Sequence, residues 1–265
     1  MYKSLPTALL TVSLVTPSAE AAPATATLVP QFVPGQTYGT VFSIMRSVKA
    51  DGYDEYAGRN GGSADYTIIT ANPDAWHMRL TWRYDGRNSG GAEVVLRDHG
   101  RTSCTLTSDG KEDCQPALDG SGLVYNPLLW GSPPKTLAAG MTWKVNIKPA
   151  WELGGENGTE QVTVVSVEAA TDTVVLMREG TADGLFGEGE STQRQLTRGG
   201  QTESLDLIPG KSHWKGYTTI VKGVIFSDEL LVTRDSILRT KSGDQVRATE
   251  RWIMVLNAAP YPTLS

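Results

Sequence analysis

The stretch from Leu137 to Thr181 constrains the fold more than any other part of this chain. It holds three β-rich runs, Met-Thr-Trp-Lys-Val-Asn-Ile, Gln-Val-Thr-Val-Val-Ser-Val and Thr-Val-Val-Leu-Met-Arg-Glu, separated by the turn sequences Gly-Glu-Asn-Gly and Ala-Ala-Thr-Asp. That pattern is typical of consecutive antiparallel strands. No segment keeps a helical period over a window of about eleven residues. We therefore predict an all-β fold, a large antiparallel meander of about ten to twelve strands with little helix, arranged as a barrel-like or two-sheet sandwich domain.

Other segments alternate apolar and polar residues in the same way. In Trp76–Tyr84 the even positions are apolar and the odd ones polar, which predicts a half-buried strand. Asn72-Pro73-Asp74 predicts the turn before it, and the Gly- and Asp-rich segment Tyr53–Ser63 predicts a loop. Pro209-Gly210 predicts the end of the short apolar piece Leu205–Ile208. Further strands are expected at 36–48, 65–71, 92–97, 102–107, 217–226, 230–240 and 245–256.

The first 21 residues have the features of a secretory signal peptide. Lys3 precedes an apolar run over Leu5–Val15, and Ala19-Glu20-Ala21 offers the cleavage site. The apolar run is shorter than the roughly 20 residues that span a bilayer. We therefore expect a periplasmic or extracellular protein that does not span the membrane after processing. Residues 22–33, rich in Ala, Pro and Thr, are predicted to be a flexible lead-in.

Residues 34–265 are predicted to form a single β domain. The Pro-Pro pair in Ser132–Lys135 is the strongest internal boundary, so a two-lobed division there is the alternative. A similar sequence opens each side, Gly35-Gln-Thr-Tyr38 and Gly140-Met-Thr-Trp143. Because a repeat requires a sustained period, this short match leaves an internal duplication as the lesser interpretation.

The two cysteines predict a disulfide across a hairpin. Cys104 and Cys114 are the only cysteines, and export makes a disulfide the expected state. A three-residue loop, Ser108-Asp109-Gly110, with Gly110 in the left-handed conformation, places the two cysteines directly opposite each other. A redox or metal role is not favoured, because the chain has no Cys-x-x-Cys motif.

Charge and motif content exclude several classes of function. The net charge of −5 argues against binding a nucleic-acid backbone. The chain has no nucleophile elbow, P-loop or dinucleotide fingerprint, and its three histidines lack zinc-site spacing, so no cofactor and no metal are predicted. Asp183, Glu188 and Glu190 offer oxygen ligands for a hard cation, but a solvated loop is the favoured interpretation because the spacing is not that of an EF-hand.

Aromatic residues cluster around the Pro-Pro boundary. Trp130, Trp143 and Trp151 lie there, with Tyr125 just before them. Aromatic side chains beside Gly and Pro turns can line a ligand site, and these four are our candidate ligand-binding residues. The more ordinary interpretation is that all of them pack in the core or at its rim.

The long meander, the aromatic cluster and the missing catalytic motif together favour a non-catalytic exported protein. It would bind an apolar or amphipathic ligand such as a lipid, or an envelope partner. The general appearance is similar to small exported bacterial β proteins that carry lipids, but no motif names a family. The alternative is a secreted glycan hydrolase that uses carboxylates such as Glu152, Glu188 or Glu190, with the tryptophans as sugar platforms.

Overall fold

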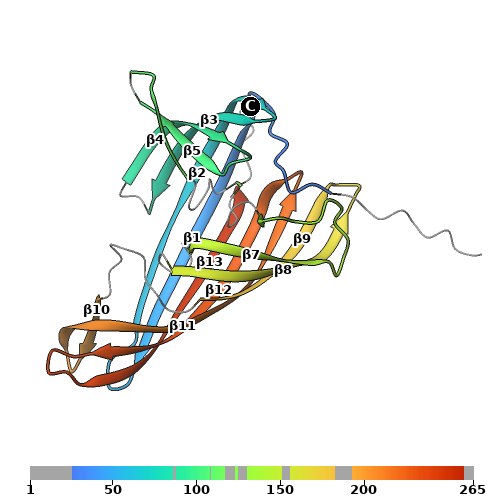
Figure 1. Ribbon diagram of the computed structural model, residues 1–265. Coiled ribbons are helices and arrows are strands. Elements are labelled where there is room, and N and C mark those ends of the chain that lie inside the picture. Colours follow the sequence, from blue (N-terminus) through green and yellow to red (C-terminus); the bar gives the residue numbers. More distant parts are fainter. Residues whose placement is uncertain are drawn as a thin grey trace, which may run out of the picture.

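The computed structural model describes residues 26–85, 88–107, 109–116, 123–124, 130–150, 156–182 and 193–259. These residues form one antiparallel sheet of 13 strands and no α-helix, so the all-β prediction is confirmed and the strand number is slightly higher than expected (Figure 1). None of the described segments is a helix long and apolar enough to cross a membrane. The strands are β1 Thr37–Ala50, β2 Tyr56–Asn72, β3 Ala75–Tyr84, β4 Asn88–Arg97, β5 Thr102–Leu106, β6 Glu112–Pro116, β7 Thr142–Ala150, β8 Glu156–Glu168, β9 Thr173–Ala182, β10 Gln193–Arg198, β11 Gln201–Val221, β12 Val224–Arg239 and β13 Gln245–Ala259.

The sheet joins the two ends of the chain at its centre. Its order is β6-β5-β4-β3-β2-β1-β13-β12-β11-β9-β8-β7, and β10 pairs with β11 beside this path. The first and last strands are therefore neighbours, paired from Gly39 opposite Ala259 to Ala50 opposite Ala248. Strands β6 and β7 are the two edges, so the sheet is not closed. The Ser132–Lys135 boundary lies between these edge strands in sequence.

The sheet curls over its own buried side chains. We call the face that carries these side chains the inner face and the opposite one the outer face. In Figure 1, β7 and β8 cross the long strands β12 and β13. Side chains from all four strands belong to one apolar cluster. A second cluster lies between β2, β3 and β4, and a third under β10 at the far end of β11 to β13. The inner face is thus filled by side chains along most of its length.

The segment before β1 packs against the sheet. Of the predicted lead-in, residues 26–33 are described, and residues 1–25, including the predicted signal peptide, lie outside the described part. The backbone N–H of Gln31 donates to the Lys222 carbonyl at 3.0 Å, and Phe32 is buried against Trp76 with ring centroids 5.2 Å apart. These contacts tie the segment to both halves of the sheet.

The turn between β11 and β12 falls inside a predicted strand. We expected one strand over 217–226, but Lys222 and Gly223 form a two-residue hairpin turn between the paired residues Val221 and Val224. Both turn residues have positive φ, 51° and 75°, as a type I′ turn requires. Lys-Gly is a weaker sequence signal for a type I′ turn than Asn-Gly. The turn was therefore missed, and the alternating residues on both sides of it were interpreted as one strand.

The two halves of the chain begin with the same backbone arrangement. Gly35 has φ 82° and donates to the Ile68 carbonyl at 2.8 Å, while Ile68 donates to the carbonyl of Gln36 at 2.8 Å. In the second half, Gly140 has φ 86° and donates to the Val164 carbonyl at 2.8 Å, and Val164 donates to the Met141 carbonyl at 2.9 Å. The short similarity between the two sequences therefore has a structural counterpart.

The correspondence extends through three further strands. The pairing of β2 with β3 shifts register directly after Ile68, and that of β8 with β9 directly after Val164. At the ends of these hairpins, the backbone N–H of Asp98 donates to the Asp74 carbonyl at 3.3 Å, and the backbone N–H of Lys222 donates to the Asp172 carbonyl at 2.8 Å. We conclude that β1–β4 and the set β7, β8, β9 and β11 share one pattern of pairing, bulge and turn.

Candidate functional site

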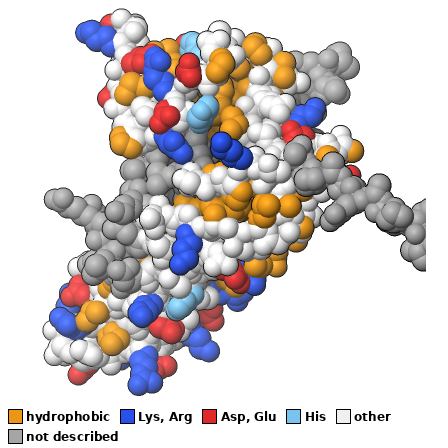
Figure 2. Space-filling model, turned by 45° about the vertical axis from the view of Figure 1, so that its right-hand side comes forward, with side chains coloured by type: hydrophobic (Ala, Val, Ile, Leu, Met, Phe, Trp, Pro, Cys, Tyr) orange, Lys and Arg blue, Asp and Glu red, His pale blue; other side chains and the backbone are white. Residues whose placement is uncertain are grey.

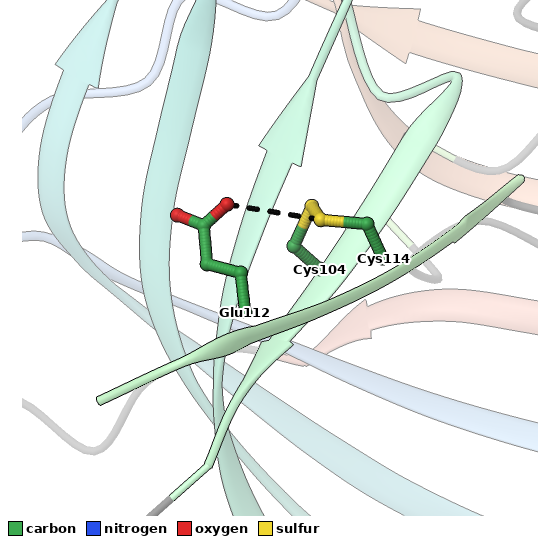
Figure 3. Close-up of side chains that lie close together, drawn as sticks. All are labelled: Cys104, Glu112 and Cys114. Carbon is green, nitrogen blue, oxygen red and sulfur yellow. Dashed lines mark hydrogen bonds between the residues drawn. A yellow bond between two sulfur atoms is a disulfide. The ribbon is translucent and has the colours of Figure 1, made fainter. Parts of the chain in front are cut away.

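The predicted disulfide is present. Cys104 and Cys114 are Cα partners on β5 and β6, with an S–S distance of 2.07 Å and Cα atoms 3.9 Å apart. Figure 3 shows Glu112 beside the bridge, with its Oε2 3.7 Å from Sγ of Cys114. These three side chains are close enough to share an ion, but disulfide sulfurs are not thiolate ligands and Glu112 already pairs with Arg97 at 2.6 Å. We therefore assign this cluster a structural role.

Two of the four predicted ligand-binding aromatics are in the described part. Trp130 and Trp143 lie in the large inner cluster, and Nε1 of Trp143 donates to the Trp130 carbonyl at 2.7 Å. Both indoles are almost fully buried, in keeping with the alternative that they pack in the core. Tyr125 and Trp151 lie outside the described residues. Ligand binding by this set stays a prediction.

An open apolar groove lies elsewhere, where the segment before β1 meets the β11–β12 hairpin. It has a volume of about 710 Å³. We call it the hairpin groove. Apolar residues supply most of its lining and come from four parts of the chain: Val33, Tyr38, Leu123, Val221, Val224, Ile225, Phe226, Ala258 and Ala259. Its polar lining is Gln31, Gln36, Thr37 and Lys222, with Gly35 and Gly39 completing the wall.

A β-bulge turns an aromatic ring toward the solvent at this groove. Thr219 pairs with Ser227 and Ile220 with Ile225, so Phe226 has no Cα partner on β11. A bulge redirects the side chain of its extra residue. Ile225 is consequently buried, whereas Phe226 keeps 55 % of its surface exposed, the largest exposed fraction among the large hydrophobic residues of the described chain.

Hydrogen bonds fix the opposite wall of the groove. The Tyr38 hydroxyl donates to Oε1 of Gln36 at 2.9 Å and accepts from the Val33 backbone N–H at 3.3 Å. Phe32 packs edge-on against Tyr38 with ring centroids 5.4 Å apart. Lys222, at the tip of the hairpin, forms no ion pair within the described residues. The hairpin groove thus has an apolar wall, a polar edge held by hydrogen bonds, and the cation Lys222.

The inner face holds two buried ion networks, neither of which sequence reasoning identified. In the first, Nε of Arg178 donates to Glu160 at 3.1 Å and Nη1 donates to Asp228 at 3.2 Å. Trp214 donates to Glu160 at 2.8 Å, and the Thr218 hydroxyl donates to Asp228 at 2.5 Å. Alternation on each strand could have placed these residues on the inner face, but not in contact across four strands.

The second network surrounds Glu250 on β13. Its carboxylate accepts from Arg46 at 2.6 Å, Arg194 at 2.7 Å and Arg234 at 2.9 Å. Arg46 and Arg234 also stack on Trp252, with guanidinium carbons 5.0 and 4.7 Å from the ring centroid. Burial by itself raises the pKa of Glu250, but the charges of Arg234, Arg194 and Arg46 outweigh it, so the net shift is downward. A carboxylate held ionised in this way suits structure rather than proton transfer.

The carboxylates of the alternative hydrolase cannot be placed. Glu152, Glu188 and Glu190 lie outside the described residues, as does Asp183. The carboxylates that the structure buries, Glu160, Asp228 and Glu250, are bound by arginines. The hydrolase interpretation therefore stays a prediction that no contact in the described part supports.

Comparison with known proteins gives no family. No protein-family model matches the chain, and no curated protein matches it. Among solved structures, similarity is found to Ail, the attachment invasion locus protein of Yersinia pestis, at 10 % identity with a TM-score of 0.23, covering 85 % of this chain and 99 % of that one. It is also found to OmpTΔL8, a loop-deletion mutant of an outer membrane protein of Vibrio cholerae, at 12 % identity with a TM-score of 0.24, covering 84 % and 99 %. TM-scores this low carry no argument about function.

Proposed function

We propose that this chain is an exported, non-catalytic β protein that binds an amphipathic ligand in the hairpin groove. The exposed ring of Phe226 over the apolar lining is the observation that supports it most directly. The apolar part of the ligand would lie between Phe226 and Tyr38, and an acidic head group would lie near Lys222.

The size and composition of the groove support this proposal. Small-molecule sites commonly have volumes of about 300–1,000 Å³ and are mostly apolar, with a few placed polar groups. At about 710 Å³, the hairpin groove lies within that range. Burying a phenylalanine side chain contributes about 1.5–3 kcal/mol, so a ligand that covers Phe226 gains appreciable affinity.

Fluorescence titration with a long-chain fatty acid that carries a fluorophore tests the proposal. We expect saturable binding to the processed protein. Phe226→Ser should lower the affinity about tenfold or more, because the ligand can no longer bury the phenyl ring. The matched control is Tyr217→Ser, because Tyr217 is similarly exposed on β11 but does not line the groove. Equal losses of affinity in both variants, or no saturable binding at all, would contradict the proposal.

The position of the head group can be tested separately. Lys222→Gln should weaken binding of the fatty acid and leave binding of the matching long-chain alcohol unchanged, since only the acid carries a charge for the ammonium group. If Lys222→Gln affected the acid and the alcohol equally, the head group would not bind at Lys222. The proposal of an apolar site in the hairpin groove would remain.

A further inference from the structure

The outer face of the central strands carries a second groove, with a volume of about 310 Å³. We call it the arginine groove. Met45 on β1 is the Cα partner of Arg59 on β2 and of Ile253 on β13. Two positions along, Ser47 is the partner of Ala57 and of Arg251. Because side chains alternate between faces, these six residues share the outer face.

Three arginines line this groove; Arg46 pairs with Glu250 at 2.6 Å, whereas Arg59 and Arg251 lack acidic partners among the described residues. Nε of Arg59 donates to the Ser43 hydroxyl at 3.1 Å, and neither Arg59 nor Arg251 forms an ion pair anywhere in the described ranges. Some other exposed cations are paired: Arg79 pairs with Glu93 at 3.0 Å and Lys215 pairs with Glu179. The guanidinium groups of Arg59 and Arg251 are therefore open to an external anion.

A row of apolar side chains crosses the sheet beside these arginines. Ile253 is the Cα partner of both Met45 and Leu231, so three apolar residues follow one another over β1, β13 and β12. Met45 is 42 % exposed and Leu231 36 %. Val41, on the same face of β1, is half exposed as well. On the face drawn in Figure 2, hydrophobic side chains reach the surface in the upper and middle parts of the view, and charged ones lie at its upper left as well as at its lower end.

From these positions we propose that the outer face of β1, β2 and β13 docks on a bilayer that contains anionic lipid. Guanidinium groups bind phosphate in bidentate geometry and are weakly hydrated, so Arg59 and Arg251 suit lipid phosphates. The row Met45–Ile253–Leu231 would then enter the interfacial region, where apolar burial and attraction to anionic lipid act together. Because the net charge of the chain is −5, the protein as a whole is not attracted to an anionic surface. Attraction to anionic lipid would therefore depend on Arg59 and Arg251. The hairpin groove has no part in this argument.

Co-sedimentation of the processed protein with vesicles is the test. The protein should bind phosphatidylcholine vesicles containing phosphatidylglycerol, bind pure phosphatidylcholine vesicles much more weakly, and lose binding as salt is raised. Each basic residue near such a surface contributes about 1 kcal/mol, so the double variant Arg59→Gln/Arg251→Gln should bind about 30-fold less tightly. A control double variant, Arg239→Gln/Lys241→Gln, removes the same charge at the far end of β12 and should bind as the unaltered protein does.

Two outcomes would overturn the proposal. One is the absence of binding to the anionic vesicles. The other is an equal loss in both double variants, which would reveal attraction through overall charge rather than through the groove. A third variant, Met45→Ser/Leu231→Ser, keeps the charges and should still weaken binding; if it bound fully, the apolar row would not touch the lipid.

Discussion

The indole Nε1 of Trp214 on β11 donates a 2.8 Å hydrogen bond to Oε2 of Glu160 on β8, although β9 lies between these strands. Position 180 on β9 is the Cα partner of both residues, and it is glycine. A Cβ there would lie 2.0 Å from Cζ2 of the indole. The ring therefore lies flat over the glycine and reaches a carboxylate two strands away.

Gly180→Ala should be strongly destabilising. The added methyl group must displace a buried indole and break its bond to Glu160, and overpacking of this kind typically costs about 1–3 kcal/mol, with an unpaired buried group adding to it. Urea unfolding monitored by tryptophan fluorescence measures the decrease in stability. Gly91→Ala is the control, because a Cβ there meets atoms no nearer than 3.2 Å at an exposed position. Equal stability of the two variants would show that the sheet adjusts to the methyl group.

The network around Glu250 should make stability depend on pH. The pKa of Glu250 in the folded protein is below its ordinary value of 4.5, so its stabilising contribution is complete above that value and is lost as the pH falls through the folded pKa. Glu250→Gln leaves three arginines around an uncharged group and should cost about 3–5 kcal/mol at neutral pH.

Free energies of unfolding measured from pH 7 to pH 3 test this expectation. The unaltered protein should lose stability toward acid, and the gap to Glu250→Gln should narrow in the same interval. A matched variant, Glu179→Gln, removes an exposed carboxylate and should change little, since exposed pairs contribute about 0–1 kcal/mol. A gap that is constant with pH would mean that Glu250 is not the titrating group.

Apolar alternation in the sequence predicted most of the strands, but it concealed the Lys222-Gly223 turn and missed β6 and β10. A further error arose where glycines interrupted the pattern. Tyr53–Ser63 was expected to be a loop, yet β2 begins at Tyr56 and pairs with β1 from Tyr56 to Thr67. Glycine is present here because neighbouring strands pack closely against the backbone, and not because the chain turns. A Cβ at Gly62 would lie 2.2 Å from the Arg83 carbonyl oxygen and 2.9 Å from the Phe42 ring.

Asn-Gly and Pro-Gly pairs misled for a related reason. Asn157 and Gly158 lie in β8 rather than in a turn, and β11 continues through Pro209-Gly210 by shifting its register. Partner strands hold these residues extended, which outweighs their local preference for turns. The ion networks and the hairpin groove depend on which distant strands become neighbours, and alternation within one strand carries no such information.

Removing the disulfide should weaken the protein without unfolding it. The bridge closes a short loop at the edge of the sheet, and in the chain-entropy model such a loop contributes about 3 kcal/mol. Cys104→Ala/Cys114→Ala should therefore unfold at lower urea concentration, and dithiothreitol should affect only the unaltered protein. The hairpin groove lies on other strands, so fatty-acid binding by the variant should persist. Loss of that binding would show that the edge hairpin supports more of the molecule than its contacts indicate.

Gly35 and Gly140 offer a test of whether the two halves are equivalent in energy as well as in geometry. Both have φ above 80°, and at neither would an added Cβ lie within 4 Å of another atom. The cost of a side chain at these positions is therefore backbone strain alone, without a steric clash. Alanine in the left-handed region costs about 1–2 kcal/mol, and asparagine, which tolerates that region, should cost less. We expect the order glycine, asparagine, alanine in urea unfolding, with matching steps at both positions. If one position tolerates alanine freely, its turn can rearrange, and the shared hydrogen bonds to Ile68 and Val164 do not hold the two halves alike.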